Sequence, residues 1–215
     1  MCCVEVRASE YARAVVALGD SITDGTMSTP STNSRWPNFL AARLLNHLSH
    51  RDVAVLDQGI GGHAVLHEFL GPNALARFDR DVIAQTAVRH IILLEKINDI
   101  GIPDTDPEGI SAGDIILAYK QFIERAHAKA IKIFGGTLAP FEGGDDFDTL
   151  GGETKRQLVN KFIRTRGAFD AVIDFDVAVR DPTHARPPAQ EHRLRDPRSD
   201  SSSQSGHGSE EATEG

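Results

Sequence analysis

Cysteines and long apolar runs are scarce in this sequence of 215 residues. Cys2 and Cys3 are its only cysteines, and they are adjacent. Adjacent cysteines rarely bridge each other, so a disulfide framework is excluded. No apolar run approaches the roughly 18 residues that a membrane span needs. The sequence therefore predicts a domain without a membrane span that folds around a hydrophobic core.

Basic charge is also in short supply. The chain has 23 Lys and Arg residues against 31 Asp and Glu residues, a formal net charge of -8. This balance argues against nucleic acid or an anionic membrane as a partner. The N-terminus has no basic segment followed by an apolar one, so we expect no signal peptide and a cytoplasmic protein. The sequence leaves open whether this chain is part of a longer protein that is exported. It also leaves the oligomeric state open.

What the sequence does contain is an alternation of short apolar segments with amphipathic ones. Helical spacing of apolar residues predicts helices over 36–48, 75–87, 112–129 and 153–166, and Ser111 with Asp114 resembles a capping box. Strands are predicted over 14–18, 53–56, 91–94, 131–134 and 171–175. This order predicts an α/β protein with a flavodoxin-like, doubly wound sheet of five parallel strands.

Composition changes near the C-terminus. Residues 185–215 include one Leu and no Ile, Val or aromatic residue. Such a segment cannot bury enough apolar surface to offset its ordering entropy. We therefore expect one domain over residues 1–184 and a disordered, low-complexity tail over 185–215. The final helix that the alternation predicts beside the first strand is missing.

The turn after the first predicted strand carries the first candidate for chemistry. The apolar run 15–18 ends abruptly in Gly19-Asp20-Ser21. A serine at the C-terminal end of a central parallel strand lies where open α/β sheets bind ligands. Backbone N–H groups of such a turn can also point at an anion, as an oxyanion site requires. The alternative is that Ser21 only caps a helix.

Three segments resemble the conserved blocks of the SGNH, or GDSL-type, esterases and lipases. Residues 19–25, GDSITDG, resemble the first block, and residues 57–62, DQGIGG, resemble the second. Residues 96–101, KINDIG, resemble the third. The resemblance covers about residues 14–182. Three blocks in order, each at the end of a predicted strand, are more specific than Gly-Asp-Ser alone.

The resemblance implies a three-layer α/β/α fold and hydrolysis of carboxylic esters, with a small-molecule ester as substrate and no cofactor or metal. By position, Ser21 is the nucleophile. The backbone N–H groups of Ser21 and Gly62 and the side-chain amide of Asn98 form the oxyanion hole. Elementary chemistry agrees, because a tetrahedral oxyanion needs neutral donors aimed at it. Glycine at position 62 lets the backbone approach the substrate, and Asp20 is expected to fix the loop by hydrogen bonds.

Two positions near these blocks depart from the family. Lys96 stands where the family has glycine, which predicts a strained backbone if the position needs a positive φ. A long cation there would also alter access to the oxyanion hole. His63 follows Gly62 where the family usually has a small polar residue, and we interpret it as a surface or cap residue rather than a catalyst.

The largest departure concerns the general base. The family has an Asp-x-x-His block near its C-terminus, followed by a helix, and the only Asp-x-x-His here is Asp181-Pro182-Thr183-His184. His184 would activate the serine, and Asp181 would orient His184. The alternative is that both are loop residues and the triad is incomplete. Because Pro187 and Pro188 forbid an ordinary helix behind His184, we expect it to be poorly held and activity to be low.

Three functions therefore compete. The leading hypothesis is a serine ester hydrolase, of the carboxylesterase or acetylesterase type, acting on small or short-acyl esters. A second is a catalytically impaired, truncated esterase that only binds esters. A third is a flavodoxin-like phosphate- or nucleotide-binding module, because residues 21–26 offer hydroxyl groups at a helix N-terminus. Against this third hypothesis, residues 21–26 include no basic side chain to bind a phosphate, and a phosphate-binding module does not explain Asn98.

Overall fold

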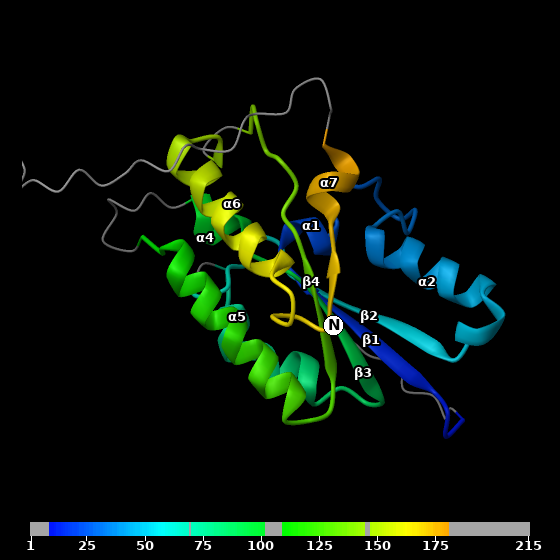
Figure 1. The fold of residues 1–215 in the computed structure, drawn as a ribbon. Helices are drawn as coiled ribbons and strands as arrows, with labels where there is room; N and C mark the ends of the chain where they lie inside the picture. The colour runs from blue at the N-terminus through cyan, green and yellow to red at the C-terminus, as the bar shows by residue number, and fades with distance from the viewer. Residues whose placement is uncertain (1–8, 69, 102–108, 145–146, 181–215) are drawn as a thin grey trace, which may run out of the picture.

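The computed structural model describes residues 9–68, 70–101, 109–144 and 147–180. Its centre is a five-stranded parallel sheet of order β2-β1-β3-β4-β5 (Figure 1). The strands are β1 Arg13–Gly19, β2 Val53–Gly59, β3 Val88–Leu94, β4 Lys132–Gly136 and β5 Ala171–Ile173. The predicted five-stranded parallel sheet is confirmed.

Helices cover both faces of this sheet, as the predicted three-layer fold requires. Figure 1 shows α5 and α6 side by side on one face and α2 on the other. The longer helices are α2 Trp36–Asn46, α5 Ala112–His127 and α6 Leu150–Arg164. The shorter ones are α1 Ser21–Asp24, α3 Ala74–Phe78, α4 Ile97–Gly101 and α7 Phe175–Val179.

The main core lies between the sheet and the face covered by α3, α5 and α6. Alternate residues of a strand point to opposite faces, so Val16 and Leu18 of β1 enter this core. Apolar side chains of the three helices meet them there, among them Phe78, Tyr119, Phe122, Val159 and Ile163. The predicted capping box is present, because Ser111 Oγ accepts from the Asp114 N–H and the Asp114 carboxylate accepts from the Ser111 N–H.

Some predicted boundaries are wrong for local reasons. The predicted helix 75–87 is α-helical only to Phe78 and continues as one π-helical segment, Asp79–Ile83. The predicted strand 171–175 ends at Ile173, because Asp174 caps α7 by accepting from the Val177 N–H at 3.2 Å. Short-range capping therefore overrode the apolar pattern at the end of β5.

Buried ion pairs anchor α7 near the end of the sheet. Asp176 accepts hydrogen bonds from Arg156 at 2.8 Å and from Arg164 and Arg180 at 2.6 Å each. Although burial raises it, these arginines lower the pKa of Asp176 to about 2. The pairing of Asp176 with these arginines thus holds the residues just before position 181.

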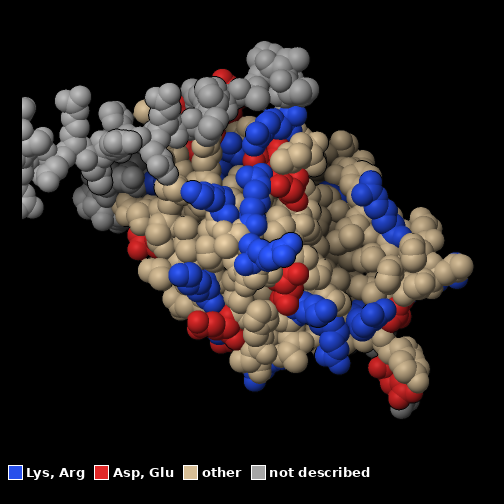
Figure 2. All heavy atoms as spheres, viewed as in Figure 1, with Lys and Arg blue, Asp and Glu red and all other residues tan. Residues whose placement is uncertain are grey.

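Figure 2 shows basic and acidic side chains interspersed on the face seen in Figure 1.

In the described part of the chain, no helix is both long enough and apolar enough to cross a membrane.

Candidate active site

Strand register brings the three family-like segments to one edge of the sheet. Gly19, the last residue of β1, pairs with Gly59 at the end of β2 and with Leu94 at the end of β3. Because the strands are parallel, the turns that follow them meet at this edge. Ser21, Gly62 and Asn98 lie in these three turns, each after a strand, as expected from the predicted strands and the resemblance to the family blocks.

Ser21 is the first residue of α1. The Asp20 side chain caps this helix by accepting from the Ile22 N–H at 2.9 Å. The other end is closed by hydrogen bonds from the N–H groups of Gly25 and Thr26 to the Ser21 carbonyl. Within the described residues, neither the N–H nor the hydroxyl of Ser21 makes a hydrogen bond. Both groups are therefore available to a bound molecule.

Gly62 lies in the loop between β2 and α3. Its φ of +74° belongs to the left-handed region, and a Cβ there would lie 2.7 Å from the Leu70 Cδ1 atom. The positive φ favours glycine at this position, whereas the exposed Leu70 side chain could move away from a Cβ. Among the described residues its N–H donates to no other group, so it can serve as a second donor beside Ser21.

Asn98 lies in the third turn and is the second residue of α4. Its side-chain amide donates to the main-chain oxygen of His63, which fixes the orientation of the amide and leaves its second N–H free to donate. The adjacent Asp99 is buried and accepts from the N–H groups of Val65 at 2.7 Å and Leu66 at 3.0 Å. Burial raises the pKa of Asp99, while these N–H groups lower it. The second and third turns are thus hydrogen-bonded to each other.

Asp20 links the first turn to the third, which agrees with the structural role expected for it. Its second carboxylate oxygen accepts from the Lys96 N–H at 3.3 Å. Asp20 is 1% exposed, and burial raises its pKa, whereas the hydrogen bonds from Ile22 and Lys96 lower it. The net effect is a raised pKa, so these hydrogen bonds offset only part of the cost of burying this carboxylate.

Lys96 differs from both expectations stated for it. Its backbone is not in the positive-φ region, so the lysine causes no strain of that kind. Its side chain does not project over the oxyanion hole either, because it is fully buried and its Nζ donates to the Gly136 carbonyl at the end of β4 at 2.7 Å. Burial lowers the pKa of Lys96 to about 7.

His63 is buried rather than a surface residue, which corrects the sequence interpretation. Its Nδ1 lies 4.0 Å from Oε1 of Glu95, and both atoms lack a hydrogen-bond partner among the described residues. Burial and the nearby Arg77 lower the pKa of His63. The structure shows no hydrogen bond between His63 and Ser21.

Asp181 and His184 lie outside the described residues, as does the predicted tail over 185–215. The described chain ends just after α7, which follows β5. In the ranges that the structure describes, no three His, Cys, Asp or Glu side chains are grouped so that they could hold a metal ion.

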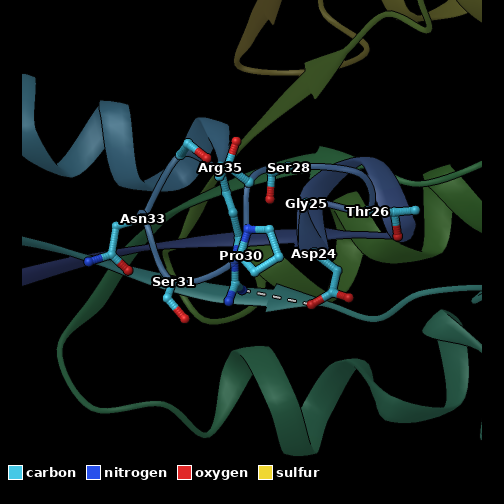
Figure 3. A pocket seen from close by; sticks show the side chains of 10 residues that line it. Asp24, Gly25, Thr26, Ser28, Pro30, Ser31, Asn33 and Arg35 are labelled. Carbon is cyan, nitrogen blue, oxygen red and sulfur yellow. Dashed lines mark ion pairs between the residues drawn. The ribbon is translucent and has the colours of Figure 1, made fainter.

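A polar hollow of about 240 Å³ is lined by residues between Asp24 and Arg35, after the first turn, and not by Ser21, Gly62 or Asn98. Figure 3 shows Arg35 extending toward Asp24, with Pro30, Ser31 and Asn33 around it. Arg35 Nη1 lies 3.8 Å from Asp24 and 3.1 Å from Asp57. The remaining lining residues are Gly25, Thr26, Ser28, Thr29 and Ser34. The Asp24 carboxylate also lies 3.6 Å from where a Cβ of Gly61 would be, so the hollow borders the Gly62 loop.

Sequence reasoning missed several residues that hold the site together. Arg77, Glu95 and Asp99 are ionisable and buried. Arg77 donates to the Gln58 carbonyl at the end of β2 and to Glu95, and Asp99 accepts from the loop after β2. Burial raises the pKa of Glu95 well above its ordinary value, although the nearby Arg77 lowers it. The sequence pattern that could have revealed them is a charged residue within or next to an apolar segment, as in Leu75-Ala76-Arg77-Phe78 and Leu93-Leu94-Glu95. Such residues are almost never fully buried without a partner.

The fold and the edge arrangement define an α/β/α hydrolase-type domain with a serine and amide donors at the ends of adjacent parallel strands. The model of the GDSL-like Lipase/Acylhydrolase family matches residues 17–211. The chain therefore belongs to this family and is a hydrolase that acts on esters. No curated protein matches the chain significantly.

Solved structures with the same fold are distant in sequence. A protein of the G-D-S-L family from Desulfitobacterium hafniense DCB-2 is 20% identical, covering 80% of this chain and 82% of its own, with a TM-score of 0.57. AlinE4, an SGNH-hydrolase family esterase, is 20% identical, covering 85% and 89%, with a TM-score of 0.54. A variant of Axe2, an acetyl xylan esterase from Geobacillus stearothermophilus, is 21% identical, covering 73% and 72%, with a TM-score of 0.55.

The buried lysine gives a prediction about stability and pH. The pKa of Lys96 is about 7 in the folded chain and ordinarily 10.5, so unfolding between these pH values takes up a proton. The free energy of unfolding of the parent should therefore rise with pH from 7 to 10 relative to Lys96→Met, by up to about 1.4 kcal/mol per pH unit. Urea unfolding at several pH values measures this difference in the free energy of unfolding.

Lys120→Met, at an exposed position of α5, is the control and should follow the parent. Parallel curves for the parent and Lys96→Met would contradict the prediction.

Proposed function

We propose that this chain hydrolyses small or short-acyl carboxylic esters through Ser21 as nucleophile. The observation that carries the proposal is the convergence of Ser21, Gly62 and Asn98 at the ends of β1, β2 and β3. Two of these residues have an unused N–H among the described residues, and Asn98 has an amide whose orientation is fixed by His63. Family membership supports the same class of reaction.

The proposed reaction follows from this geometry. Ser21 Oγ attacks the carbonyl carbon of the ester while a base takes its proton, and the oxygen of the tetrahedral intermediate becomes negative. The N–H groups of Ser21 and Gly62 and the amide of Asn98 donate to this oxyanion. Collapse of the intermediate expels the alcohol, which takes up the proton, and water then hydrolyses the acyl-enzyme.

The general base completes the proposal. We assign it to His184, oriented by Asp181, on the basis of the Asp-x-x-His pattern alone. The pairing of Asp176 with three arginines supports this assignment indirectly, because it fixes the chain just before Asp181.

The polar hollow supports a small substrate as a surface next to the Ser21 turn, since Ser21, Gly62 and Asn98 do not line it. Its lining residues carry hydroxyl, amide, carboxylate and guanidinium groups, and Pro30 is the one apolar side chain among them. A long acyl chain placed there would lose contact with water without gaining apolar contacts. A short acyl or polar alcohol group loses little, so p-nitrophenyl acetate is a suitable first substrate.

The nucleophile assignment predicts that Ser21→Ala abolishes both hydrolysis of p-nitrophenyl acetate and labelling by a fluorophosphonate. A serine ester hydrolase needs its Oγ for both reactions, whereas an alanine offers no nucleophile. Ser49→Ala removes an exposed serine at the opposite edge of the sheet and should retain both. Undiminished labelling of Ser21→Ala would rule out the assignment.

The oxyanion assignment predicts a loss in turnover when Asn98 is replaced. Removal of one oxyanion donor typically lowers kcat by about 10²–10³, because the donor acts in the transition state. Asn98→Ala should therefore lower kcat by about that factor with little change in KM, as steady-state kinetics would measure. The exposed Asn46→Ala variant serves as the matched control. A rise in KM alone would make Asn98 a ground-state binding residue instead.

The base assignment predicts a pH effect. With His184 as the base, the rate for the parent should rise as pH increases through about 6–7, because the imidazole must be neutral to accept a proton. His184→Ala should lose this rise together with most of the rate, whereas His50→Ala, an exposed histidine of the opposite edge, should keep both. Coincident pH–rate profiles for the parent and His184→Ala would leave the chain either catalytically impaired or served by another base.

A further inference from the structure

Arg77 is a charged side chain for which the proposed reaction gives no role. It belongs to α3, and its side chain is fully buried. Burial of a guanidinium is costly, and the hydrogen bonds that its donors make offset this cost. In Arg77 these bonds come from Nη1 and Nη2, whereas Nε makes none among the described residues. The positions of those bonds indicate what Arg77 does.

The guanidinium of Arg77 donates at the ends of three neighbouring strands. Nη1 donates to the Gln58 carbonyl of β2 at 2.9 Å, and Nη2 donates to the Gly19 carbonyl of β1 at 3.3 Å. Nη2 also donates to the carboxylate of Glu95, the residue after β3, at 3.1 Å. The turns carrying Gly62, Ser21 and Asn98 begin directly after these three points.

Glu95 extends this link toward the oxyanion loop. Its main-chain oxygen accepts from the Tyr119 hydroxyl at 2.9 Å, so its backbone is held from α5 as well. Its free carboxylate oxygen lies 4.0 Å from Nδ1 of His63, which follows Gly62 directly. The His63 carbonyl in turn accepts from Asn98. Glu95 thus adjoins His63, the residue that follows Gly62 and accepts from Asn98.

Ladder hydrogen bonds alone do not fix this geometry. They hold β2, β1 and β3 side by side up to Gly59, Gly19 and Leu94, and the turns lie beyond those residues. An oxyanion hole must be held within roughly 0.5 Å of its productive geometry. A single planar side chain with several fixed donors can hold three strand ends together, which a lysine cannot.

We propose that Arg77 is a positioning residue that fixes the relative placement of the turns carrying Ser21, Gly62 and Asn98. It acts through Gly19, Gln58 and Glu95 and contacts no substrate. This role rests on the proposed function of those three residues.

The test is Arg77→Lys, which keeps a positive charge beside Glu95 but cannot reach all three acceptors. It should lower kcat for p-nitrophenyl acetate by about 10- to 100-fold with KM changed less than about twofold, because misplacement by about 1 Å costs on the order of 10² in rate. The matched control is Val159→Ala, which weakens the core under α6. It should lower the unfolding midpoint and leave kcat per folded molecule unchanged.

A second measurement does not depend on activity. In ¹H–¹⁵N spectra, the amide signals of Ser21 and Gly62 and the side-chain amide of Asn98 should all move or broaden in Arg77→Lys and stay in place in Val159→Ala. Should Arg77→Lys not fold, Glu95→Gln takes its place, because it weakens the same link while leaving the guanidinium on the two carbonyls.

The outcomes separate this inference from the proposed function. A parent whose hydrolysis depends on Ser21, with parental kcat and unmoved amide signals in the folded Arg77 or Glu95 variant, would show that Arg77 only contributes stability. A parent without esterase activity would overturn the proposed function, and the amide signals alone would then decide whether Arg77 positions the three turns.

Discussion

The buried carboxylate of Asp20 is the interaction on which the arrangement of this edge depends most. One of its oxygens caps α1 through the Ile22 N–H, and the other accepts from the Lys96 N–H in the turn after β3. A carboxylate out of water is stable only when such donors replace the water. The hydrogen bonds therefore fix two turns relative to each other, and Ser21 follows Asp20 directly in the chain.

The same principle recurs around the site. Asp99 holds the loop after β2 through two backbone N–H groups, and the buried pair of Arg77 and Glu95 lies under the ends of three strands. Buried ionic groups of this kind are weak evidence for stability, because desolvation offsets most of their attraction. Their physical consequence here is directional, since each hydrogen bond specifies where a particular turn lies.

Lys96 shows how a departure from a family pattern can be accommodated. A glycine at this position would leave space beside β4, and the lysine side chain fills the interior there with its Nζ on the Gly136 carbonyl. The ammonium is poorly solvated, which lowers its pKa to about 7, so the chain carries a group that titrates near neutral pH under its proposed active site. Access to the Ser21 turn is not obstructed by it, since the side chain is fully buried.

The amino-acid sequence by itself determined that the sheet has five strands and that they run parallel. It also determined the capping box at Ser111 and the three turns with Ser21, Gly62 and Asn98. These features depend on local periodicity and on short motifs, which act within a few residues. Tertiary structure alone decided that Arg77, Glu95 and Lys96 are buried, and that His63, directly after Gly62, is buried as well. The burial of Arg77 and Lys96 depends on partners such as Gly19, Gln58 and Gly136, which are 19 to 58 residues away in the chain. From the sequence alone, a charged side chain is predicted to be solvent-exposed, because the distant acceptors that allow its burial are known only from the fold.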